Sequence, residues 1–313
     1  MPDGPIRLLL GPQRPTHNLS EAIAQAGLPE GQIATISAGW QEAENDIDDL
    51  REIVGRPLAD LRLYARADEV FSADADLARR YRSRQDHLKE QQSLYRQRLK
   101  HLAIAARQTI RAEGEPEMIA AEQRHAIAQL RALDRYHLHR TESGHKPFEE
   151  AFNTDRSELL ARHYREINEI IDDSSAVMIT GGNIMVLLNR MRLFGVKRLL
   201  EKKHLVAWSA GAMVLAERIV LFHDRTPQGR RDAEVFGAGC GLIHGGIFLP
   251  DAAHRLRESE RSRIELMSRR FSPDECITLD NGTALEFADG TMLKTGTARR
   301  FTNDGRIVRL KVA

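Results

Sequence analysis

Short apolar runs alternate with amphipathic segments near both ends of the chain. Each run has the length of one buried strand, and glycine, proline or polar turn residues separate it from the helical pattern that follows. The predicted strands cover residues 6–10, 33–37, 58–64, 176–180, 205–208, 247–249 and 276–279, and the predicted helices cover residues 21–25, 41–54, 184–194, 212–219 and 255–271. This alternation predicts an α/β fold with a doubly wound, mostly parallel sheet. The C-terminal tail is predicted to form β-hairpins that turn at residues 289–290 and 303–305.

The middle of the chain has only helical patterns. Residues 74–113 contain no glycine or proline, and as one helix they would be about 60 Å long at ~1.5 Å per residue. A turn at residues 114–116 leads to a second helix over residues 117–139, and a break is predicted at residues 144–147. One apolar face then predicts a third helix, with Phe148, Phe152, Leu160, His163, Ile167 and Ile171. We therefore predict a helical insertion, residues 73–174, between core parts 1–72 and 175–313.

The first helix of the insertion carries a partial heptad row and a basic charge bias. Tyr81, Leu88, Tyr95 and Leu102 recur every seven residues, which is the only sequence feature that suggests a homodimer. Residues 79–111 hold ten Lys or Arg and only two acidic residues. Either this face binds an acidic partner or it is a solvated surface, and we favour the second because the whole insertion is close to neutral. No aromatic platform accompanies the charge, so we do not expect nucleic-acid binding.

Composition and motifs exclude several classes of protein. Lys plus Arg number 46 against 45 Asp plus Glu, and the two cysteines are too few for a disulfide framework. No apolar window is long enough to cross a membrane, and the N-terminus lacks the pattern of a secretory signal. No phosphate-binding glycine loop is present, and His137, His139 and His145 lack a spacing that defines a metal site. We expect a soluble, cytoplasmic protein that needs no cofactor and no metal.

The strongest candidate for chemistry is a serine at a strand-to-helix turn. The apolar run that ends at Trp208 breaks at Ser209, and a serine in such a turn exposes its hydroxyl beside free backbone N–H groups. A second strand ends at Gly181-Gly182-Asn183, and ligands bind at the carboxyl ends of parallel strands. The N–H of Ala210 and one from Gly181 or Gly182 would then form an oxyanion hole. The alternative is that Ser209 only caps a helix.

Three segments resemble the dipeptidase E and cyanophycinase family. They are residues 179–188 (ITGGNIMVLL), residues 208–212 (WSAGA) and residues 279–285 (LDNGTAL). The resemblance covers the predicted sheet but not the helical insertion. It implies a class I glutamine amidotransferase-like fold with a serine nucleophile, a histidine base and an acidic residue later in the chain.

The family pattern transfers to this chain only in part. Ser209 matches the nucleophile. The family histidine follows the strand that corresponds to residues 247–249, but here Pro250 and Asp251 follow, and His254 comes three residues later. Asn281 occupies the position of the acid, with Asp280 beside it as a substitute. The remaining candidates are Gly182 and Ala210 for the oxyanion hole, Gly181, Asn183 and Asp251 for substrate binding, and His244 as a second candidate base.

Two functions are consistent with these residues. The first is a serine-type hydrolase of an amide bond, most plausibly in a small peptide, in which Ser209 attacks and His254 transfers the proton. The second is a binding or scaffold protein that has lost the catalytic arrangement and acts through its helical insertion. A His254 side chain close to Ser209 favours the first function, whereas a displaced His254 with Asp251 facing Ser209 favours the second.

Overall fold

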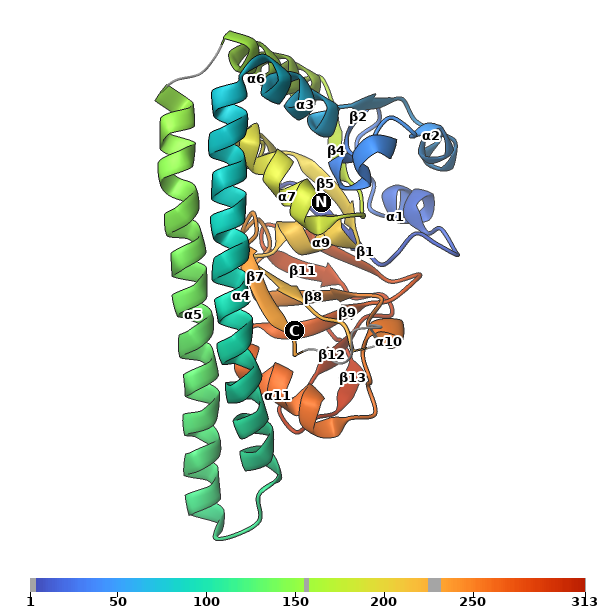
Figure 1. The fold of residues 1–313 in the computed structure, drawn as a ribbon. Coiled ribbons are helices and arrows are strands. Elements are labelled where there is room, and N and C mark those ends of the chain that lie inside the picture. Colours follow the sequence, from blue (N-terminus) through green and yellow to red (C-terminus); the bar gives the residue numbers. More distant parts are fainter. Residues whose placement is uncertain (1–3, 155–157, 225–231, 313) are drawn as a thin grey trace.

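A seven-stranded, mostly parallel sheet forms the centre of the structure and confirms the predicted α/β fold class (Figure 1). The computed structural model describes residues 4–154, 158–224 and 232–312. The strand order is β11-β10-β1-β5-β4-β2-β3, with the five strands from β1 to β3 parallel and β10 and β11 antiparallel at one edge. The strands are β1 (Ile6–Leu10), β2 (Ile33–Ile36), β3 (Leu58–Asp60), β4 (Ala176–Ile179), β5 (His204–Trp208), β10 (Ala284–Ala288) and β11 (Thr291–Lys294).

Helices cover both faces of this sheet, as the doubly wound prediction requires. Side chains alternate between the two faces along each strand. Leu8 and Leu10 pack with α1 (Leu19–Gln25) and α2 (Asp48–Val54) on one face. Leu9 belongs to the other core, which includes side chains of α3 (Leu63–Ala73) and α7 (Ile184–Leu193).

A second, smaller sheet extends the core on the C-terminal side. Its order is β13-β12-β9-β8, where β8 and β9 are parallel. A separate pair, β6 (Arg218–Leu221) and β7 (Glu234–Ala238), is antiparallel. The strands of the smaller sheet are β8 (Gly246–Pro250), β9 (Glu275–Leu279), β12 (Arg299–Phe301) and β13 (Ile307–Arg309). The predicted hairpins are confirmed, because β10 pairs with β11 and β12 pairs with β13.

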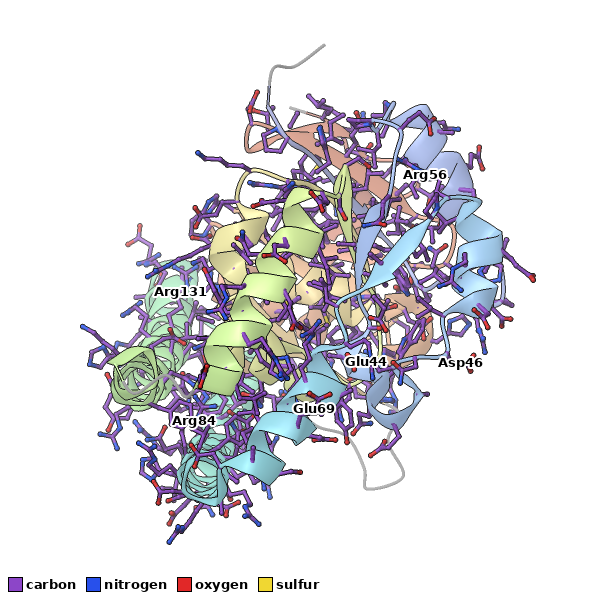
Figure 2. All side chains as sticks on the ribbon, turned by 90° about the horizontal axis from the view of Figure 1, so that it is seen from above. Glu44, Asp46, Arg56, Glu69, Arg84 and Arg131 are labelled. Carbon is purple, nitrogen blue, oxygen red and sulfur yellow. The ribbon has the colours of Figure 1, made fainter. Side chains whose placement is uncertain are left out.

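Two long helices stand beside the core and form an antiparallel hairpin (Figures 1 and 2). They are α4 (Ala75–Arg111) and α5 (Pro116–Thr154), and α6 (Glu158–Asp172) then leads back to the sheet. Both helices contact the core, since α4 and α5 each pack against β7 and α11. None of the helices in the described ranges is both long enough and apolar enough to cross a membrane.

The heptad row of α4 is used inside the chain. Tyr81 and Tyr95 are buried, and Leu88 and Leu102 are half-buried. Tyr95 stacks on His137 of α5 with ring centroids 4.1 Å apart, and its hydroxyl bonds to Asp134 of the same helix. The row therefore gives no support to a homodimer, which stays a prediction without structural backing.

The predicted break at residues 144–147 is wrong. α5 continues through Gly144 and Pro147 to Thr154, so Phe148 lies on α5 rather than on the third helix. The Phe148 ring contacts Tyr81 at a centroid distance of 6.0 Å and lies 4.1 Å from the Arg84 guanidinium carbon. These contacts with α4 favour a continuous helix over the local preference of glycine and proline to end it. The side chain of Phe152 lies outside the described residues.

Three other helix predictions need correction. The helix predicted at residues 212–219 is α9 (Ala210–Leu215), and residues 218–221 form β6 because Ile219 and Val220 pair with β7. The helix predicted at residues 255–271 is divided into α10 (Ala252–Arg255) and α11 (Arg261–Phe271), since Leu256 is extended.

The helix predicted at residues 41–54 is the 3₁₀ helix η1 (Ala38–Ala43) followed by α2, because Gln41 has a φ of 60°. The strand predicted at residues 58–64 ends at Asp60, and α3 begins at Leu63.

A buried polar cluster joins the helical hairpin to the core. Asp134 of α5 accepts from the Tyr95 hydroxyl at 2.9 Å, and Arg270 of α11 donates to both Asp134 oxygens at 2.7 and 2.6 Å. The Tyr95 oxygen also accepts from the N–H of Val235 in β7 at 3.0 Å. Burial raises the pKa of the Tyr95 hydroxyl far above its usual range. The Arg270 and Asp134 side chains are only 2% and 3% exposed, so each charge depends on the other.

Replacing Asp134 by alanine would leave the Arg270 guanidinium buried without its carboxylate. We expect the free energy of unfolding, measured by urea denaturation, to fall by about 3–5 kcal/mol. The matched control is Asp86→Ala, because the Asp86–Lys89 pair is 73% and 72% exposed and such pairs contribute about 1 kcal/mol or less. Equal losses in the two variants would contradict the role assigned to the cluster.

Candidate active site

Ser209 lies at the turn between β5 and α9 in a strained backbone conformation. β5 ends at Trp208, α9 begins at Ala210, and Ser209 itself has φ 51° and ψ −118°. A non-glycine residue in such a region costs about 1–3 kcal/mol, and strain of this kind gathers at functional sites. The Ser209 N–H donates to the Leu10 carbonyl of β1 at 3.3 Å, which fixes the turn at the carboxyl end of the sheet. The predicted strand–turn–helix arrangement is confirmed.

Glycines make room for this turn. A Cβ at Gly181 would lie 3.0 Å from the Ser209 Cβ, and one at Gly211 would lie 2.2 Å from the Ile179 carbonyl oxygen. Gly182 has a φ of 108°, and a Cβ there would lie 2.4 Å from the Gly39 carbonyl oxygen. The turns after β4 and β5 therefore pack directly against each other, as expected from their positions on adjacent parallel strands.

A cavity of about 470 Å³ opens at Ser209. Its lining residues come from strand ends and from the two walls around them: Pro12, Gly182, Ile184, Ser209, Ala210, Met213, Leu221, Phe222, His223, Asp232, Glu234, Pro250, Asp251 and Arg255. Within the described ranges, the backbone N–H groups of Gly182 and Ala210 donate to no other group. Both N–H groups are therefore available to a negatively charged oxygen formed next to the serine.

A second cavity, of about 430 Å³, lies between the helical hairpin and α7. Arg84, Glu142 and Cys240 are among its lining residues. None of the predicted site residues lines it.

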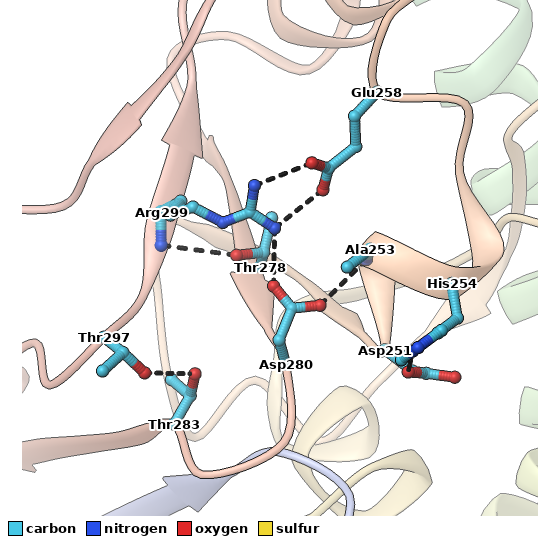
Figure 3. Close-up of polar contacts among 9 residues, drawn as sticks. All are labelled: Asp251, Ala253, His254, Glu258, Thr278, Asp280, Thr283, Thr297 and Arg299. Atoms are coloured by element: carbon cyan, nitrogen blue, oxygen red, sulfur yellow. Dashed lines mark hydrogen bonds and ion pairs between the residues drawn. The ribbon is translucent and has the colours of Figure 1, made fainter.

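His254 lies outside the residues that line the Ser209 cavity, whereas Asp251 lies among them. The His254 Nδ1 is 2.6 Å from Asp251 Oδ1, and the His254 side chain is 80% exposed (Figure 3). Asp251 has a φ of 59° and begins α10, with its N–H bonded to the Leu279 carbonyl at 3.0 Å. The contacts of His254 therefore give it no direct path to Ser209, and its role as the base stays a prediction.

Asp280 and Asn281 hold neighbouring segments in place. Asp280 accepts from the Ala253 N–H at 2.9 Å and from Arg299 at 2.7 Å (Figure 3). Hydrogen bonds to Glu258, and then to Asp280, raise the pKa of Arg299. Asn281 donates to the carbonyls of residues 12, 14 and 16, at 2.7, 3.3 and 2.9 Å. Neither side chain has a described contact with His254, so the predicted role of orienting that imidazole has no support in these contacts.

The side chains of Asn183 and His244 make contacts other than those predicted for them. The Asn183 side chain accepts from the N–H groups of Met185 and Val186, at 3.0 and 3.2 Å, and so caps α7. That contact accounts for the asparagine without a substrate. His244 pairs with Glu217 at 3.2 Å and does not line the cavity.

His223 and Arg255 line the cavity but were not among the predicted site residues. His223 comes two residues after the end of β6. It lies between the buried residues Phe222 and Asp224. The Asp224 N–H donates to the Arg255 carbonyl at 2.9 Å, which joins the two walls of the cavity.

Arg255 brings a positive charge into the cavity. Its guanidinium lies 5.4 Å from the centre of the Phe222 ring, an arrangement in which the ring attracts the cation. Burial lowers the pKa of Arg255, and the charge of Asp251 partly offsets this effect. In the described part of the chain the guanidinium has neither a hydrogen bond nor an ion pair. An unpaired and partly buried arginine is suited to bind a carboxylate.

Comparison with solved structures gives distant resemblances. A peptidase from an acI-B1 Actinobacterium is 13% identical, with 98% of this chain and 97% of that chain covered and a TM-score of 0.45. A candidate peptidase E protein from Listeria monocytogenes EGD-e is 16% identical, with 44% and 65% covered and a TM-score of 0.31. A comparison with curated proteins finds no match.

The profile of one protein family provides the assignment. It is described as Peptidase family S51, and it matches residues 134–295, which include Ser209 and most of the cavity wall. The matched segment is more than half of the chain. The chain therefore belongs to peptidase family S51.

Proposed function

We propose that this chain is a serine-type peptidase with Ser209 as its nucleophile and a short peptide as its substrate. The observation that carries the proposal is the strained Ser209 turn, which faces a cavity beside two unpaired backbone N–H groups. A strained backbone that aims a hydroxyl into a cavity is costly to fold and useful to a nucleophile. The family supports a peptidase, and the serine type rests on Ser209.

The reaction follows from these positions. The Ser209 hydroxyl oxygen attacks the peptide carbonyl carbon, and its proton passes to a histidine. The N–H groups of Gly182 and Ala210 hold the resulting oxyanion. The histidine then protonates the leaving amine, an acyl-enzyme remains, and a water deprotonated by the same histidine releases the acid and restores Ser209.

His223 is the histidine that we propose for the proton transfer. It lines the cavity together with Ser209, while His254 is exposed and bonded to Asp251. A general base must come within hydrogen-bond reach of the proton that it removes. His254 is the base expected from the sequence. It could act only if α10 rearranged so that the imidazole moved past Asp251 and reached Ser209.

Arg255 supports a small peptide as the substrate. A cavity of about 470 Å³ is in the range that encloses a small ligand rather than a folded chain. The unpaired guanidinium of Arg255 would bind a carboxylate of that peptide, either the C-terminal group or an acidic side chain.

A binding protein without catalytic activity is the second candidate. The observation that favours it is the arrangement of Asp251 in the cavity and His254 outside it. The basic bias of α4 adds little to this alternative, because Arg79, Arg80, Lys89, Arg96 and Arg107 each pair with an acidic residue of the same chain.

Labelling with a fluorophosphonate probe tests the nucleophile. We expect one probe per chain by intact mass and no labelling of Ser209→Ala, because only an activated serine reacts quickly with such a probe. Ser20→Ala is the matched control, since Ser20 is an exposed serine on α1, and it should label like the wild type. A folded wild-type protein that stays unlabelled would support the binding protein instead.

The two candidate bases are separated by measuring the labelling rate of His223→Gln and His254→Gln. We expect His223→Gln to slow labelling by about 100-fold or more, which is the usual contribution of a general base. His254→Gln should change the rate by less than about threefold, because its side chain is exposed and outside the cavity. The opposite ranking would restore His254 as the base.

Peptide pairs that differ in one carboxylate test Arg255. We expect Arg255→Gln to lower kcat/KM by about 10- to 100-fold for peptides with the recognised carboxylate, as is typical for a lost charged hydrogen bond. Comparing a C-terminal acid with its amide, and Asp with Asn, identifies which carboxylate binds. An equal loss for all four peptides would show that Arg255 only supports the fold of α10.

A further inference from the structure

The helical hairpin supplies the cations that neutralise one wall of the Ser209 cavity. Glu234 and Asp232 line that wall. Arg96 of α4 makes a two-point contact with Glu234, with Nη2 2.9 Å from Oε1 and Nε bonded to Oε2. Arg107 of α4 pairs with Asp232, whose Oδ1 also lies 3.7 Å from Arg263 of α11. Both carboxylates are thus paired with cations that lie outside the cavity lining.

The same face of α4 also fixes the backbone of this wall. Gln92 donates to the Val235 carbonyl at 3.3 Å, and the Tyr95 hydroxyl accepts from the Val235 N–H at 3.0 Å. Residues 92, 95 and 96 are neighbours on one helix face, and residue 107 lies three turns beyond residue 96 on that face. β7 lies directly against α4 in the fold (Figure 1). This face of α4 therefore contributes to both the position and the charge of the wall.

This pairing decides the electrostatic character of the cavity. Its third carboxylate, Asp251, is bonded to His254. Arg255 is the one lysine or arginine among the lining residues that the structure describes, and its guanidinium makes no ion pair there. With Glu234 and Asp232 paired, the Arg255 guanidinium can attract an anion, whereas exposing Glu234 would add a negative charge that repels it.

We propose that Arg96 and Arg107 of the helical insertion are specificity-determining residues, which make the cavity selective for peptides that carry a free carboxylate. The inference rests on the proposed peptidase function and adds a role for the insertion. Neither arginine lines the cavity, so both act through the carboxylates that they neutralise. Arg96 has the larger role, because among the described residues Glu234 pairs with Arg96 alone, whereas Asp232 also has Arg263.

The test compares Arg96→Gln with the double variant Arg96→Gln/Glu234→Gln. Two measurements are made: the labelling rate of Ser209 with a neutral and a carboxylate-bearing fluorophosphonate, and the binding of Ala-Ala-Ala and its C-terminal amide to the Ser209→Ala form. We expect Arg96→Gln to reduce the preference for the carboxylate about tenfold, the size of one like charge at ~10 Å in a partly screened site. The double variant should recover the preference, because it removes the unpaired carboxylate as well.

The matched control is Arg98→Gln, an exposed arginine of α4 whose guanidinium lies 5.5 Å from the Tyr136 ring centre. It should leave both measurements unchanged. A loss of binding or labelling that is equal for the charged and neutral probes, or that the double variant fails to recover, would reduce Arg96 to a purely structural role.

No preference for the carboxylate in the wild type, in either measurement, would overturn the proposal. A wild type that is labelled but shows no such preference would leave the peptidase function standing, whereas an unlabelled wild type would count against the function itself.

Discussion

The buried contact among Tyr95, Asp134 and Arg270 is the constraint on which the rest of the structure depends. It joins α4, α5 and α11, and through the Val235 N–H it also reaches β7. A charged pair in a dry interior is stable only when both members are present and well bonded. The hairpin is therefore fixed at one register against the core, and that register brings Arg96 and Arg107 opposite Glu234 and Asp232.

The candidate site has a floor of closely packed turns and two walls. The floor is the pair of turns after β4 and β5, where glycines at positions 182 and 211 allow backbone approaches that a Cβ would prevent. One wall comes from residues 221–223, 232 and 234, in or next to β6 and β7, and the other comes from residues 250, 251 and 255, in or next to α10. This division is common in α/β proteins, where a fixed strand end carries the reacting group and the surrounding segments choose the ligand.

The sequence alone predicted the features that depend on short segments of the chain. The alternation of strands and helices predicted the sheet, and small residues around Ser209 predicted its turn. The helix break predicted at Pro147 was wrong, because the packing of Phe148 on α4 outweighs the local preference of proline to end a helix. His223 and Arg255 were missed, because their approach to Ser209 depends on how β6 and α10 pack rather than on any spacing. His254 was proposed from the family resemblance, which places a histidine after this strand. Here Asp251 adopts a left-handed conformation just before α10, and His254 bonds back to Asp251.

The position of the hairpin in the chain has a consequence for the order of assembly. α4 and α5 are adjacent in sequence and contact each other closely, so this pair can form early from local contacts. The wall that α4 contacts, at residues 232–235, begins 78 residues after the end of α5, and it also follows Ser209. A growing chain therefore contains the serine turn before it contains an enclosing wall or the arginine at position 255. The cavity comes into existence only when the last third of the chain closes on a hairpin that is already formed.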